Sequence, residues 1–166
     1  MASGDVAEQK VISLLQKGGH EALKNEDRET RAFYDVEAVL VDKVSDATLA
    51  EFTLEVKNDV YALKSGNVAV EVWNSKSDKP SGLTVTKSDI WVFVVGEEIW
   101  AANTLKLREF VDKTVPKRTV TNAGDGNASI LLFEKDVIFG DVFERLDELE
   151  QEELTTTLLG LLNVAT

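Results

Sequence analysis

The chain has 166 residues, 43% of them hydrophobic and 29% charged, and this composition excludes a fibrous, collagen-like or wholly disordered protein. The length fits one compact domain, or a domain with a short appendage. No apolar run approaches the roughly eighteen residues of a membrane span, and the N-terminal sequence MASGDVAEQK lacks the regions of a signal peptide. We therefore expect an intracellular, cytoplasmic protein without a membrane partner.

Cysteine is absent and histidine occurs once, at His20, which narrows the chemistry open to the chain. Disulfides, thiolate zinc sites, iron–sulfur clusters and cysteine nucleophiles are excluded, and so is a site with several histidine ligands. Any metal must be held by oxygen ligands. Such ligands favour hard cations, of which Mg²⁺ and Mn²⁺ are the expected ones.

The formal net charge is −12, and it is distributed unevenly. Residues 134–153 hold nine acidic and two basic side chains, a net of −7, so the rest of the chain carries −5. The acidity argues against tight non-specific binding of DNA, but it does not exclude a substrate held through a metal and a few cations. We expect a core domain over residues 1–133 and an acidic helical appendage over 134–166.

A helix is expected over residues 5–17, followed by a stop at Gly18 and Gly19. Its apolar positions recur at helical spacing, and Asp5 and Glu8 have the spacing of a capping box. Glu8 also lies three residues before Val11, on the apolar side of the helix. A carboxylate in that position needs a partner.

Strands with alternating apolar residues come next and predict an antiparallel meander, over residues 31–41, 49–60 and 68–73. The second half is expected to begin with a short helical turn over 84–89, a buried strand over 90–95 and its partner strand over 97–102. A helix over 104–113, a loop over 122–127 and a further strand over 130–133 follow. This order predicts an α/β fold with a central mixed sheet flanked by helices. The acidic remainder would form one or two helices that dock on the core or on a second copy of the chain, which leaves a homodimer open.

The informative combination is Asp35 on the first of these strands with Glu55 and Lys57 on the second. Residues two apart in a strand share a face, so Glu55 and Lys57 point the same way. If the hairpin brings Asp35 opposite, two carboxylates and an ammonium converge. They predict a Mg²⁺ or Mn²⁺ site with the backbone carbonyl of Val56 as a further ligand. Such a site activates water and suits phosphodiester hydrolysis, in which Lys57 orients the water or offsets charge on the phosphate.

The arrangement resembles the PD-(D/E)XK nuclease superfamily, whose fold is restriction-endonuclease-like. The resemblance covers residues 4–95 and is carried by GDVAEQKVISLLQKGG, YDVEAV, FTLEVKND and VAVEVWN…SGLTVTKSDIWVFVV. In layout the chain looks most similar to Holliday-junction resolvases and small phage-type nucleases. Tyr34 stands where the proline of the family's name would precede Asp35.

The resemblance implies a metal-dependent endonuclease that acts on DNA in preference to RNA. Asp35 and Glu55 would hold the metal and Lys57 would position the nucleophilic water. Glu8 would assist, directly or through a water, unless its role is capping alone.

Other residues are weaker candidates. Glu71 lies in a second motif, Glu71-Val72-Trp73, which has tryptophan where lysine is needed, and it could serve as an auxiliary ligand or as a base-contacting residue. His20 is an alternative ligand, although a histidine after Gly-Gly more often interacts with free carbonyls at a helix C-terminus. Lys64 and Lys87 are candidate phosphate contacts. Glu37 and Asp59 are expected to be surface charges.

Two interpretations other than a nuclease remain. One is a non-catalytic acidic interaction module on a nuclease-like fold, which the charge of −12 supports. The other is a general α/β binding protein in which Glu55 and Lys57 are solvated charges or a surface ion pair of little energetic weight.

Overall fold

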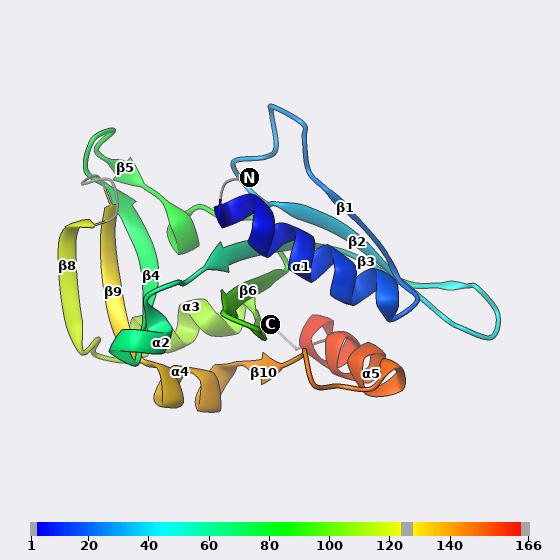
Figure 1. Ribbon diagram of the computed structural model, residues 1–166. Helices are drawn as coiled ribbons and strands as arrows, with labels where there is room; N and C mark the ends of the chain where they lie inside the picture. The colour runs from blue at the N-terminus through cyan, green and yellow to red at the C-terminus, as the bar shows by residue number, and fades with distance from the viewer. Residues whose placement is uncertain (1–2, 124–127, 164–166) are drawn as a thin grey trace.

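A computed structural model describes residues 3–123 and 128–163 and arranges them as two β-sheets with helices packed against them (Figure 1). The larger sheet has the strand order β1-β2-β3-β6-β7-β10, with bounds Glu21–Lys24, Val36–Val41, Thr48–Asn58, Ile90–Val95, Glu98–Asn103 and Glu144–Arg145. The smaller sheet has the order β5-β4-β9-β8, with bounds Lys79–Pro80, Asn67–Asn74, Ala128–Glu134 and Arg118–Ala123. The chain therefore has the expected α/β architecture with a mixed central sheet.

The larger sheet is mixed because β3 pairs with β6 in parallel, while its other pairings are antiparallel. It does open with an antiparallel meander, but the three strands are β1, β2 and β3. The prediction that residues 68–73 form the third strand of this meander is wrong, since β4 pairs with β9 and β5 in the smaller sheet. Alternating apolar residues identify a strand with one buried face, but they do not identify its neighbour.

The strand expected from residue 31 begins only at Val36. Residues 28–33 form turns, in which the Arg31 N–H donates to the Asp27 carbonyl at 2.9 Å and the Phe33 N–H to the Thr30 carbonyl at 2.8 Å. The polar segment before these turns contains β1, which the sequence did not predict. Its short length and single buried residue, Ala22, give little alternation to detect.

One face of the larger sheet is covered by α1 (Ser3–Lys17) and α5 (Gln151–Leu162). Figure 1 shows α1 lying across β2 and β3. Between these helices and the sheet lies a cluster of buried apolar residues from all of them, including Val11, Leu15, Val36, Leu54, Val56, Val92, Leu154 and Leu158. The C-terminal acidic segment thus contributes to the same core as the first helix. Its strand β10 also pairs with β7.

The opposite face packs on a second cluster that the smaller sheet shares with α3 (Thr104–Lys113) and α4 (Lys135–Val142). Trp91 and Phe93 of β6 are fully buried in it. Because β6 is covered on both faces, Ile90–Val95 reads as one continuous apolar run, as expected for a buried strand. The helix expected over 104–113 has those bounds.

Short elements join the two sheets. The chain leaves β3 through α2 (Ala62–Ser65), enters β4, and returns to β6 through the 3₁₀ turn η1 (Gly82–Thr84) in place of the helical turn expected over 84–89. The sequence did not predict β8, and it placed residues 122 and 123 in a loop although they belong to that strand. The rest of the expected loop, 124–127, lies outside the described residues. None of the helices within the described ranges is long and apolar enough to cross a membrane.

Candidate functional site

Asp35 is hydrogen-bonded to the residues on both sides of Glu55. Its backbone N–H donates to the Leu54 carbonyl at 2.8 Å, and its Oδ2 accepts from the Val56 N–H at 2.8 Å. The Asp35 carbonyl also accepts from the Asn25 N–H at 2.8 Å, after the end of β1. The aspartate is thereby fixed at the start of β2, beside the middle of β3.

Glu55 is buried, with 8% of its surface exposed. Its neighbours Leu54 and Val56 point into the cluster beneath α1, so Glu55 points to the other face of the sheet. Burial raises the pKa of Glu55 to about 8, and a hydrogen bond with the neighbouring Asp35 carboxyl contributes to the rise, while Lys57 opposes it. Glu55 is therefore not a solvated surface charge.

Lys57 lies on the same face as Glu55 and is paired with it. Its Nζ is 3.4 Å from Glu55 Oε2, and it lies over the Trp91 ring at 5.6 Å from the centroid. The Lys57 side chain is 37% exposed, so the ammonium reaches solvent while its stem packs on the buried ring. The Lys57 ammonium is therefore at the solvent side of the carboxyl pair.

Val56 contributes through its backbone. Its side chain is buried beneath α1, and its N–H bonds Asp35. In a strand the N–H and C=O of one residue point to the same edge, so the Val56 carbonyl also points to the Asp35 side of β3. An oxygen ligand is thus available on the edge where the aspartate lies.

Glu8 approaches this group from α1, but it already has a cationic neighbour. Its Oε2 lies 3.5 Å from Lys24 Nζ, which is also 2.6 Å from Asp5 Oδ1. Burial raises the pKa of Glu8, and the nearby charge of Asp35 adds to the rise. The predicted capping box is wrong, because α1 begins at Ser3 and Asp5 lies inside its first turn.

The structure does not bring His20 to this group. His20 is buried, its Nδ1 accepts from the Val41 N–H at 3.1 Å, and its Nε2 lies 2.9 Å from Thr155 Oγ1. Because Nδ1 accepts, Nε2 carries the proton and donates to Thr155. The ring connects β2 to α5 and does not interact with the carbonyls at the end of α1. Burial lowers the pKa of His20, with a further contribution from Lys43.

The remaining candidates are dispersed. Glu71 is on β4 of the smaller sheet, and Lys64 is exposed on α2. The Lys87 ammonium lies 4.2 Å from the centroid of the Phe33 ring. Phe33 precedes Asp35 by two residues. Asp59 is not the expected surface charge, because its carboxylate accepts from the Ala62 N–H at 3.1 Å and from the Ala69 N–H at 2.9 Å, where the chain passes between the sheets.

Two neighbours of the site were missed by sequence reasoning. Lys24 is on the unpredicted strand β1, so nothing placed it near Glu8. Thr86 lies with its Oγ1 3.4 Å from Glu55 Oε1, and it is buried. A threonine thirty-one residues from its partner gives no sequence signal, because this contact depends on the loop that precedes β6.

Within residues 3–123 and 128–163, no group of three or more histidine, cysteine, aspartate or glutamate side chains is arranged to hold a metal ion. The donor set at this site is smaller: the two carboxyls of Asp35 and Glu55 with the Val56 carbonyl. Oxygen donors of this kind suit Mg²⁺ or Mn²⁺, which keep several waters when bound.

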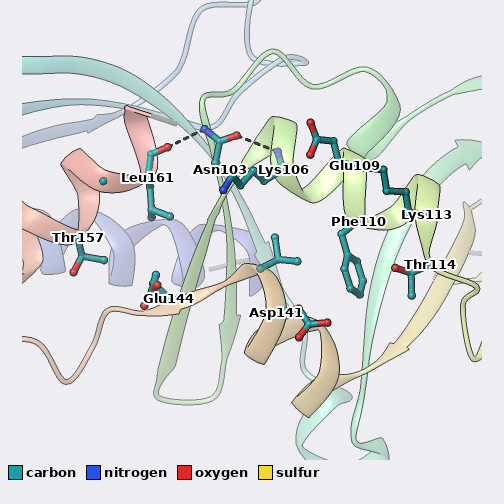
Figure 2. Close-up of a pocket in the computed structure, with 12 residues that line it drawn as sticks. Asn103, Lys106, Glu109, Phe110, Lys113, Thr114, Asp141, Glu144, Thr157 and Leu161 are labelled. Atoms are coloured by element: carbon teal, nitrogen blue, oxygen red, sulfur yellow. Dashed lines mark hydrogen bonds between the residues drawn. The ribbon is translucent and has the colours of Figure 1, made fainter. Parts of the chain in front are cut away.

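A cavity of about 770 Å³ lies between α3, α4 and α5 and shares no residue with this group. Figure 2 shows Asn103 at its edge, where the side chain accepts from the Lys106 N–H and donates to the Leu161 carbonyl. The charges of its walls are mixed: α3 contributes two lysines and Glu109, and the opposite wall contributes Asp141 and Glu144. This composition favours no one class of ligand.

The chain matches no protein-family model and none of the curated proteins. Among solved structures it is similar to a bacterial homing endonuclease, I-Ssp6803I, with a TM-score of 0.40 and 18% sequence identity. The similarity covers 89% of this chain and 78% of the endonuclease chain. At this level it identifies neither a family nor a function for the chain.

Proposed function

We propose that the chain is a divalent-metal-dependent nuclease that hydrolyses phosphodiester bonds, with Asp35, Glu55 and Lys57 as its active-site residues. The observation that carries the proposal is the pairing of two carboxyls, one of them buried, beside a half-exposed lysine. Buried carboxyls are costly unless a charge or proton compensates them. A site that combines two such carboxyls with a solvent-accessible lysine ammonium is a candidate for catalysis.

The residues present fit a hard divalent cation. Glu55 retains a proton up to about pH 8 because it is buried beside Asp35. The two carboxyls would hold such a cation in place of that proton, and its charge would offset theirs. Asp35, Glu55 and the Val56 carbonyl would hold the ion, with Glu8 as an assisting residue whose carboxylate Lys24 orients.

A bound Mg²⁺ or Mn²⁺ supplies Lewis-acid polarisation of a phosphate oxygen and lowers the pKa of water. The chain supplies the remaining functions. Lys57 offers an ammonium donor at the solvent side of the carboxyl pair, where it can orient a water and stabilise charge that develops on a phosphate. The buried Trp91 ring beneath Lys57 restricts where that ammonium can lie.

The substrate class rests on the resemblance of residues 4–95 to PD-(D/E)XK nucleases, which favours DNA over RNA. The test is an assay of single-stranded, duplex and branched DNA, and of RNA, with and without Mn²⁺. We expect metal-dependent cleavage of DNA that EDTA stops. Absence of cleavage of every substrate at any metal concentration would contradict the proposal.

The charge of −12 favours a second candidate, a non-catalytic acidic module that binds a basic partner. Metal binding separates the two candidates, because only the nuclease requires it. A protein whose melting temperature does not change with Mn²⁺, and which cleaves nothing, would support the acidic module.

A further inference from the structure

A chain of buried hydroxyls lies behind the carboxyl pair. Thr86, Ser88 and Thr104 are 4%, 6% and 2% exposed. Thr86 Oγ1 is 3.0 Å from Ser88 Oγ, which is 3.3 Å from Thr104 Oγ1. Buried hydroxyls are costly unless they are hydrogen-bonded, so a chain of three beside a buried carboxyl needs a structural or functional reason.

The hydroxyl of Thr86 contacts strand β3 and the turn that precedes Asp35. It lies 3.0 Å from the Phe33 carbonyl, two residues before Asp35, and 3.4 Å from Glu55 Oε1. It also accepts from the Ser88 N–H at 3.2 Å. A hydroxyl has one proton to donate, so the Phe33 carbonyl, Ser88 Oγ and Glu55 compete for it. Ionised Glu55 is the only charged acceptor of the three, and a charged acceptor makes the stronger hydrogen bond, which favours donation of the Thr86 proton to Glu55 in that state.

The segment that carries Thr86 is itself anchored. Arg108 on α3 donates through Nε to the Leu83 carbonyl at 3.0 Å and through Nη2 to the Thr86 carbonyl. The Lys87 N–H ties the same segment to Phe33. Glu55 is therefore held by Lys57 at Oε2 and by Thr86 at Oε1, and Thr86 is fixed by α3, which packs on the face of the sheet to which Glu55 points.

We propose that Thr86 is a positioning residue: its hydroxyl sets the orientation of the Glu55 carboxylate and its separation from Asp35, so that both can bind one divalent cation. This inference rests on the proposed nuclease function and deepens it. Residues that orient metal ligands in this way typically change metal affinity or activity by about 10- to 100-fold when they are removed.

The test compares Thr86→Val, which keeps the shape and removes the hydroxyl, with Thr86→Ser, which keeps the hydroxyl. Thr119→Val on the exposed strand β8 is the matched control. Mn²⁺ affinity, kcat and KM for cleavage of duplex DNA, and thermal stability are measured for each variant and for the unmodified chain. We expect Thr86→Val to weaken Mn²⁺ binding and lower kcat by about 10- to 100-fold with KM for DNA unchanged. Thr86→Ser should stay within about threefold of the unmodified chain, and Thr119→Val should match it.

Three outcomes overturn the inference. The first is Thr86→Val with unchanged Mn²⁺ affinity and kcat. The second is a loss in Thr86→Ser as large as that in Thr86→Val, because the methyl group and not the hydroxyl would then matter. The third is an unmodified chain that neither binds Mn²⁺ nor cleaves DNA, and only this result also removes the proposed function.

Discussion

Asp35 is hydrogen-bonded to both neighbours of Glu55: its N–H donates to the Leu54 carbonyl and its Oδ2 accepts from the Val56 N–H, each at 2.8 Å. These bonds give the two carboxyls a fixed relationship that does not depend on a cation. A preformed pair needs little reorganisation to bind one. The same closeness makes the pair unfavourable when both groups are ionised and no cation is bound.

Replacement of Asp35 by asparagine should weaken Mn²⁺ binding by about 10- to 100-fold, because the amide removes one of the two negative charges and keeps an oxygen that can accept from Val56. Isothermal titration with Mn²⁺ measures the effect. Glu51→Gln is the matched control, since Glu51 is an exposed carboxylate on the same strand as Glu55. Equal affinities for Asp35→Asn and the control would show that Asp35 is not a ligand.

Replacement of Lys57 by alanine should reduce cleavage by at least about 100-fold while the fold is kept, because the side chain is partly exposed and contributes modestly to stability. Single-turnover cleavage of duplex DNA at saturating Mn²⁺ measures the loss, and circular dichroism checks the fold. Lys76→Ala, at an exposed position in the turn after β4, should cleave like the unmodified chain. Cleavage by Lys57→Ala at the rate of that control would remove lysine from the mechanism.

The raised pKa of Glu55 predicts a pH dependence of stability in the metal-free protein. Between its ordinary value of 4.5 and about 8 the folded chain keeps a proton on Glu55 that the unfolded chain has lost. Stability contributed by this proton is therefore present below about pH 4.5 and is lost as the pH rises to about 8. Glu55→Gln should not show this loss and should exceed the unmodified chain by about 1–3 kcal/mol above pH 8.

Urea unfolding in EDTA at several pH values from 5 to 9 tests this expectation through the difference between the two proteins. The difference should grow with pH and level off above about 8. A difference that is constant across this range would mean that Glu55 has an ordinary pKa and that neither burial nor Asp35 disfavours its ionisation.

His20 should be important for stability and unimportant for metal binding. Its two ring nitrogens bond the Val41 N–H and Thr155 Oγ1, so His20→Ala removes both bonds and leaves a small cavity between β2 and α5. We expect a loss of about 1–3 kcal/mol in the free energy of unfolding with Mn²⁺ affinity unchanged. Chemical denaturation and metal titration of the same variant give both values. A large loss of Mn²⁺ affinity in a folded variant would restore His20 as a ligand.

Much of the site was accessible from the sequence because its central part is local. Glu55 and Lys57 share a face by the two-residue period of a strand, and the alternation of Phe52, Leu54 and Val56 marks that strand clearly. The nearness of Asp35 followed from a hairpin of adjacent strands. That Glu55 is buried could not be read from alternation, because its polar face is covered by elements distant in sequence, including the loop of Thr86.

The fold was harder to predict where pairing is non-local. The strand at Val68 and Val70 was recognised, but nothing in it showed that its partner is β9, more than fifty residues later. The helix of Leu154 and Leu158 was recognised as well. Its place beneath the larger sheet depends on α1 and β10, and on contacts such as His20 with Thr155 that join opposite ends of the chain.

In the proposed function, the Asp35–Glu55 pair binds a divalent cation that supports hydrolysis of DNA. The most direct measurement is the rate of nicking of a supercoiled plasmid as a function of Mn²⁺ concentration, for the unmodified chain and for Glu55→Gln. We predict no nicking in EDTA, a rate that saturates with Mn²⁺, and a loss of at least about 100-fold in the variant. Nicking by Glu55→Gln at the rate of the unmodified chain, or no nicking by either protein at any Mn²⁺ concentration, would contradict the claim.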